Sequence, residues 1–222
     1  MSISENLQKI KDSLPEGVTL VAVSKTKPIA DIMQAYEAGH RVFGENKVQE
    51  MTEKWQQLPK DIEWHMIGHV QRNKVKYMAP FVSLIHGVDS LKLLKEIDKE
   101  ARKNNRIIFC LLQIHIAQEN TKFGFDAEEV ITILEDDAFT SLQHIKIVGL
   151  MGMATFTEDE KVIKKEFQYI KSLFKTLKLK SETHTLKPEI LSIGMSGDYL
   201  IAIENESTMV RMGSAIFGDR NY

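Results

Sequence analysis

Short runs of apolar and β-branched residues alternate with longer amphipathic stretches from about residue 18 onward. Apolar residues at a period of two predict strands, and a period near 3.6 predicts helices. Strands that alternate with helices in this way are typical of a parallel sheet. The pattern predicts eight strands, over residues 18–24, 41–44, 63–68, 83–88, 107–116, 146–153, 190–195 and 209–213.

The clearest predicted helix covers residues 89–103. It has a charged face and an apolar stripe, as expected of a helix that covers the outside of a sheet or barrel. Another helix is predicted over residues 4–14, before the first strand, and the polar stretch 178–187 is predicted to be a surface loop. The apolar stripe of the clearest helix consists of Leu91, Leu94, Ile97 and Ala101.

Eight strand-helix units predict a closed (β/α)8 barrel of the TIM type with an extra N-terminal helix. A doubly wound open sheet would also alternate strands and helices. However, no Gly-x-Gly-x-x-Gly motif follows the first strand, which disfavours the dinucleotide-binding version of that fold. No linker, low-complexity block or long charge run divides the 222 residues, so we expect one domain over residues 1–222.

Composition excludes several classes of partner. There are 29 basic and 31 acidic residues without a basic cluster, so nucleic acid is not expected to bind. No apolar run approaches the roughly 18–20 residues that span a bilayer, and the N-terminus lacks the apolar stretch of a signal peptide. Cys110 lies in an apolar run and is expected to be a small buried thiol. We therefore expect a cytoplasmic protein that does not contact membranes.

Lys25 directly follows the first predicted strand. In such barrels, the carboxyl ends of the strands and the loops after them form the active face. A lysine that is partly desolvated there has a lowered pKa, and its amine condenses readily with an aldehyde. An exposed loop lysine is the alternative, particularly with Lys27 two residues away.

Two segments near the C-terminus predict an anion site. Ser196 lies between the seventh strand and a predicted helix that begins near Asp198, where a hydroxyl and free N–H groups can face a phosphate. The eighth strand ends with Arg211, Gly213 and Ser214. Barrels commonly bind phosphate after their last two strands. The alternative is that these glycines and serines form turns and that Arg211 pairs with a carboxylate.

The strand ends together resemble the pyridoxal phosphate homeostasis protein family, whose barrel is similar to the N-terminal domain of alanine racemase. The resemblance covers nearly the whole chain. It rests on the segments AVSKTKP (22–28), FGEN (43–46) with Gln49 and Glu50, WHMIGH (64–69) with Gln71, Asn73 and Lys74, LSIGMSGD (191–198), STMVRMG (207–213) and AIFG (215–218).

The resemblance implies that pyridoxal 5′-phosphate (PLP) is bound as a Schiff base on Lys25. It implies that Arg211 faces the pyridine nitrogen and that Asn46 and Met195 line the cofactor. The implied role is intracellular PLP (vitamin B6) homeostasis, with PLP-dependent apoenzymes as candidate recipients. The residues that would hold the phosphate are Ser196, Gly213 and Ser214.

The chain departs from the family pattern at two places. In Gln113-Ile-His115 the family commonly has asparagine at the third position, and Glu206 stands where a glycine is usual. These departures affect the expected contacts near the fifth strand and the loop before the eighth. The segment 119–125 also resembles a family motif, but the sequence assigns it no role.

Three histidines, His65, His69 and His86, lie near predicted strand ends. Their spacing puts them on different strands or at different depths, and no paired carboxylates accompany them, so no metal site is expected. His69 and His86 either line the mouth of the cofactor site or are satisfied polar positions.

The resemblance implies a PLP carrier or regulator rather than a strong amino-acid enzyme. An arginine beside the pyridine nitrogen keeps that nitrogen unprotonated and weakens the ring as an electron sink. Alanine racemases take one base from a tyrosine on a separate C-terminal domain, often across a dimer, and this chain ends at Tyr222, directly after the barrel. We therefore expect a monomer. The alternative is a PLP-dependent amino-acid racemase of weak or narrow activity.

Overall fold

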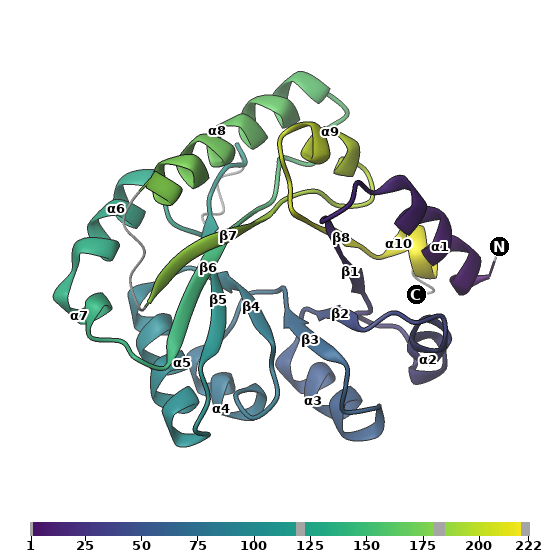
Figure 1. Cartoon of the computed structure of the whole chain (residues 1–222), viewed down its shortest axis with the longest axis horizontal. Helices are drawn as coiled ribbons and strands as arrows, with labels where there is room; N and C mark the ends of the chain where they lie inside the picture. Colours follow the sequence, from purple (N-terminus) through teal and green to yellow (C-terminus); the bar gives the residue numbers. More distant parts are fainter. Residues whose placement is uncertain (1, 119–122, 180–184, 219–222) are drawn as a thin grey trace.

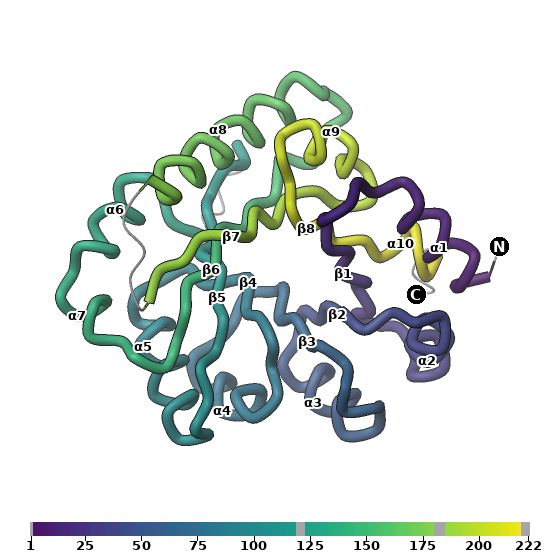
Figure 2. Tube along the Cα trace, in the orientation of Figure 1, coloured from purple at the N-terminus to yellow at the C-terminus, as the bar shows by residue number. Residues whose placement is uncertain are grey.

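The computed structural model describes residues 2–118, 123–179 and 185–218. Its parallel strands form a closed barrel in chain order, and β8 pairs with β1 to complete it (Figures 1 and 2). The strands are β1 (Thr19–Val23), β2 (Val42–Glu45), β3 (Glu63–Met66), β4 (Leu84–Val88), β5 (Ile108–Ile114), β6 (Ile145–Gly152), β7 (Leu186–Ser192) and β8 (Met209–Met212).

Helices surround the strands and connect them, as the labels in Figure 1 show. The first helix, α1, precedes the barrel and packs beside the last, α10, so the two ends of the described chain lie close together. The helices are α1 (Ile3–Ser13), α2 (Ile29–Glu37), α3 (Val48–Gln57), α4 (Val75–Met78), α5 (Leu91–Lys103), α6 (Ala127–Glu135), α7 (Asp137–Thr140), α8 (Glu160–Leu179), α9 (Tyr199–Glu204) and α10 (Ser214–Phe217), with a 3-10 turn at Arg72–Lys74.

Two hydrophobic cores hold the barrel together. The larger lies between the strands and the surrounding helices, and includes the fully buried side chains of Phe43 and Trp64. The smaller is built from strand residues, as expected for the inside of a barrel. Its buried members are Val21, Leu84, Leu111, Val148, Met151 and Met209.

The predicted barrel, its eight strands and its leading helix are confirmed. The helix predicted over 89–103 begins at Leu91, because the Ser90 hydroxyl accepts a hydrogen bond from the N–H group of Leu93 and caps it. No helix among the described residues is long and apolar enough to cross a bilayer.

The surface loop predicted over 178–187 is wrong at both ends. Residues 178 and 179 belong to α8, and β7 begins at Leu186 rather than at residue 190, while 180–184 lie outside the described residues. Leu186 pairs with Ile147 of β6, and Leu186 and Pro188 are buried on one side of the strand. Pairing with a long neighbouring strand therefore extends β7 into a sequence whose local composition resembles a loop.

Candidate functional site

A cavity of about 820 Å³ opens at the carboxyl ends of the barrel strands. This is the face on which barrels of this type carry their sites, and the volume suits a small organic cofactor. All seven residues predicted to bind a cofactor line this one cavity: Lys25, Asn46, Met195, Ser196, Arg211, Gly213 and Ser214.

Lys25 is half-buried at the wall of the cavity, in the turn that follows β1. The turn is closed by a hydrogen bond from the N–H group of Lys27 to the carbonyl oxygen of Ser24, 3.0 Å long. Its third residue, Thr26, has φ of +63°, a left-handed conformation that costs a residue other than glycine about 1–2 kcal/mol. The surrounding structure therefore has to hold Lys25 in a strained turn.

The predicted anion-binding segments face the same cavity. Ser196 lies in the β7–α9 turn and Ser214 opens α10, directly after β8. Within the described residues, neither hydroxyl has a hydrogen-bond partner. A Cβ atom at Gly213 would lie 3.3 Å from the carbonyl oxygen of Val23, so a side chain there would press on β1 beside Lys25. The site thus offers two unused hydroxyls where an anion can approach the backbone closely.

Arg211 is buried in the floor of the cavity, with 4% of its surface exposed. Nη1 donates to the carbonyl oxygen of Ser192 at 2.7 Å and to its hydroxyl at 2.6 Å, and Nη2 donates to the carbonyl oxygen of Gly152 at 2.9 Å. Burial lowers the pKa of Arg211 to about 10, opposed by the charge of Asp198, so the guanidinium stays charged at neutral pH. Arg211 is held by carbonyls rather than by the carboxylate partner that the alternative required.

Beneath Arg211, a chain of hydrogen bonds leads into the barrel. The hydroxyl of Ser192 lies 3.2 Å from Nδ1 of His86, and Nε2 of His86 lies 3.1 Å from Nδ1 of His65. Burial lowers the pKa of His65 to about 3 and that of His86 well below its ordinary value, so both rings are neutral. Because Arg211 only donates, Ser192 is free to donate to Nδ1 of His86, which places the proton of His86 on Nε2.

The other predicted features divide between cavity and core. His69 lines the cavity, 3.0 Å from a carboxylate oxygen of Asp89, whereas His86 is wholly buried and is not part of the lining. No group of three metal-ligating side chains occurs among the described residues. Cys110 is buried as predicted, and burial raises the pKa of its thiol.

Sequence reasoning missed part of the lining. Gln113, next to the last residue of β5, lines the cavity, and its amide nitrogen donates to the carbonyl oxygen of Phe123 at 3.3 Å. Residues 153–157, directly after β6, form another part of the wall. Their position after a strand was the available signal. Of the motif-like segment 119–125, residues 119–122 lie outside the described residues, and Phe123 lines the cavity.

Comparison with known sequences identifies the family. A family model for the alanine racemase N-terminal domain matches residues 1–221. The pyridoxal phosphate homeostasis protein of Aquifex aeolicus (strain VF5) is 36% identical, over 99% of this chain and 96% of that protein. The protein of the same name from Escherichia coli (strain K12) is 35% identical, over 99% and 97%.

Solved structures show the same barrel. PipY of Synechococcus elongatus PCC7942, solved with PLP bound, is 33% identical, with a TM-score of 0.88 over 98% of this chain and 100% of that chain. Alanine racemase from E. faecalis has a TM-score of 0.75 at 19% identity, over 98% of this chain and 58% of that chain, which shows a likeness of fold alone. By its sequence and its barrel, the chain belongs to the pyridoxal phosphate homeostasis protein family.

Proposed function

We propose that this chain binds PLP in the cavity at the carboxyl end of the barrel, as a Schiff base on Lys25, and serves PLP homeostasis. The observation that carries the proposal is the convergence of Lys25, the unused hydroxyls of Ser196 and Ser214, and the buried cation of Arg211 on one cavity. PLP has groups that match these features: an aldehyde, a phosphate and a ring nitrogen. The known binding of PLP by PipY, a relative at 33% identity, supports the same ligand.

PLP would supply an aldehyde that exchanges reversibly with amines. Lys25 would hold this group through Nζ, since an amine that condenses with an aldehyde replaces its C=O bond by a C=N bond and releases one water molecule. Lys27, the alternative lysine, donates from Nζ to the carbonyl oxygens of Phe217 and Gly218, each at 3.0 Å. These bonds hold its amine at the C-terminal segment, which favours Lys25 as the attachment point.

The test is to reduce the PLP-loaded protein with borohydride and map the modified peptide. The loaded protein should be yellow before reduction. After reduction, the pyridoxyl group should be found on Lys25. Lys25→Ala should abolish the covalent adduct, and Lys27→Ala should keep it. A pyridoxyl group on Lys27 with Lys25 unmodified would refute the assignment.

We further propose a carrier or regulator rather than a strong amino-acid enzyme, working in the cytoplasm, where PLP-dependent apoenzymes are candidate recipients. The charged Arg211 disfavours a protonated ring nitrogen. Incubating loaded protein with amino acids in deuterated water tests this. Rapid exchange of the α-hydrogen would favour a racemase instead.

A further inference from the structure

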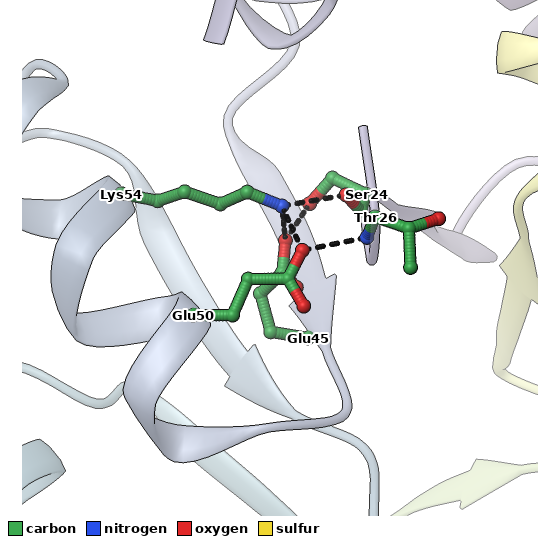
Figure 3. A network of polar contacts seen from close by, with 5 residues as sticks. All are labelled: Ser24, Thr26, Glu45, Glu50 and Lys54. Carbon is green, nitrogen blue, oxygen red and sulfur yellow. Dashed lines mark hydrogen bonds and ion pairs between the residues drawn. The ribbon is translucent and has the colours of Figure 1, made fainter. Parts of the chain in front are cut away.

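A cluster of charged side chains contacts Ser24 and Thr26, the residues on either side of Lys25 (Figure 3). None of these charged side chains is part of the lining of the cavity. Glu45 ends β2, and Glu50 and Lys54 lie one turn apart on α3. Nζ of Lys54 lies 2.7 Å from Oε1 of each carboxylate. The Lys54 side chain is 8% exposed and that of Glu45 is wholly buried, whereas Glu50, 24% exposed, lies at the edge of the cluster.

The cluster holds both peptide units that flank Lys25. Nζ of Lys54 donates to the carbonyl oxygen of Ser24 at 2.7 Å, which fixes the peptide unit before Lys25. Oε1 of Glu50 accepts from the N–H group of Thr26 at 2.6 Å, which fixes the peptide unit after it. The backbone torsions of Lys25 are therefore set by side chains from α3 (Figure 3).

Glu45 ties the same turn to β2. Its Oε1 accepts from the hydroxyl of Ser24 at 2.6 Å and from Lys54. Its second oxygen, Oε2, is buried without a hydrogen-bond partner among the described residues. Burial raises the pKa of Glu45, opposed by the charge of Lys54.

The turn needs such support because Thr26 has a positive φ in a position that ordinarily takes glycine. Buried ion pairs such as that of Lys54 and Glu45 contribute little to the net free energy of unfolding, since the desolvation of the charges offsets their attraction. Its better attested use is to select one conformation, and here the conformation selected is that of the turn that carries Lys25.

We propose that Glu45, Glu50 and Lys54 are positioning residues for Lys25, which fix the backbone on both sides of it and so direct its amine toward the PLP aldehyde. This inference rests on the proposed PLP function. It assigns the three residues a role in the rate and extent of covalent attachment, separate from the binding of the phosphate by the residues that follow β7 and β8.

The test compares Glu50→Ala with two controls. Glu50→Gln keeps an oxygen that accepts from Thr26, and Glu53→Ala removes an exposed carboxylate from the same helix. Two quantities are measured: the rate of borohydride-trapped attachment of PLP to Lys25, and the affinity for pyridoxine 5′-phosphate, which has an alcohol in place of the aldehyde and cannot attach. A native amide-exchange measurement on the unloaded protein reports the protection of the Thr26 N–H group.

We expect Glu50→Ala to attach PLP about tenfold more slowly (about 1.4 kcal/mol in the barrier) and to lose protection at Thr26. Its affinity for pyridoxine 5′-phosphate should stay within about twofold of wild type, because the residues proposed to hold the phosphate follow β7 and β8 and are not altered by the substitution. Glu50→Gln and Glu53→Ala should attach PLP at nearly the wild-type rate.

An unchanged attachment rate in Glu50→Ala would overturn the inference, as would an equal loss of pyridoxine 5′-phosphate affinity. If wild type itself forms no adduct on Lys25, the proposed function fails instead, so the two failures are distinguishable. Should Glu50→Ala not fold, the comparison is made in Thr26→Gly, where glycine tolerates the positive φ. Glycine relieves the strain but also makes the turn more flexible, so the bond to Glu50 is still needed to fix the backbone of Lys25. The Thr26→Gly/Glu50→Ala protein should therefore attach PLP about tenfold more slowly than Thr26→Gly, and equal rates would refute the inference.

Discussion

The hydroxyl of Ser196 is a donor with no partner among the described residues, at the wall of a cavity that contains a lysine. We predict that it donates to the phosphate of PLP. Ser196→Ala would then remove one hydrogen bond to a charged group and weaken PLP binding by about 1.5–3 kcal/mol, or roughly tenfold to a hundredfold. Titration with PLP measures the change, and attachment to Lys25 should still occur at saturation.

The matched control for this prediction is Ser172→Ala, an exposed serine on α8 away from the cavity. It should bind PLP like wild type. Unchanged affinity in Ser196→Ala would place the phosphate elsewhere in the cavity, and Ser214 would be the next residue to test.

Buried histidines make the stability of the protein sensitive to acid. Burial lowers the pKa of His40 to about 4 and that of His65 to about 3, whereas the unfolded chain takes up these protons near pH 6.5. Above pH 6.5 these histidines are neutral in both states and do not lower the free energy of unfolding. It should fall by about 1.4 kcal/mol per pH unit for each histidine as the pH drops toward 4.

Urea unfolding at pH 7.5, 6.0 and 5.0 measures this dependence. Replacement of one of these histidines, as in His40→Asn, should make the slope between pH 6 and 5 shallower. A free energy of unfolding that stays constant from pH 7.5 to 5.0 would contradict the assigned neutral state of the buried rings.

At the scale of elements, the end of α9 carries a strained residue. Glu206 follows the C-cap residue Asn205 and has φ of +64°, in the position where the family pattern usually has glycine. Glycine is the common residue at this point of a helix because it adopts the left-handed conformation without steric cost. The departure noted in the sequence thus coincides with a backbone that favours the family residue.

Glu206→Gly should raise the melting temperature by roughly 2–4 °C. The relief of backbone strain should outweigh the loss of the exposed ion pairs of Glu206 with Lys171 and Lys175. The matched variant Glu206→Ala loses the same ion pairs but keeps the strain, and should melt at or below the wild-type temperature. A lower melting temperature for Glu206→Gly than for Glu206→Ala would show that the strain is not significant.

At the scale of the whole molecule, we predict a monomer in solution. Several of the large exposed apolar side chains surround the cavity mouth, including Phe123, Met153 and Phe156. Others, such as Tyr77 on α4 and Leu200 on α9, lie on separate elements. Apart from the group at the cavity mouth, the exposed apolar side chains are scattered, which favours a monomer over a stable dimer, since a dimer needs one extensive apolar face. Light scattering over a dilution series measures the mass, and a constant dimer mass would contradict the prediction.

The sequence alone determined the barrel and which residues converge on one cavity. Period-two and period-3.6 patterns are local, so eight strands and the helices at 4–14 and 89–103 could be located from them, with errors of a few residues at the ends, whereas the longest helix, α8, was not given bounds. Since the carboxyl ends of parallel strands meet on one face, the positions of Lys25, Ser196 and Ser214 after their strands were enough to predict that they lie together. Their roles toward PLP stay predictions.

Tertiary structure decided what lies between and behind those residues. The sequence did not indicate that Lys54 and Glu50 reach the peptide units beside Lys25, because the contact joins residues far apart in the chain. Nor did it indicate that Arg211 donates a hydrogen bond to Ser192, or that Ser192 is in turn hydrogen-bonded to the first of two neutral buried histidines. Strand pairing also fixed the start of β7, where local composition predicted a loop. Such features depend on side-chain direction and on burial, which only the closed barrel defines.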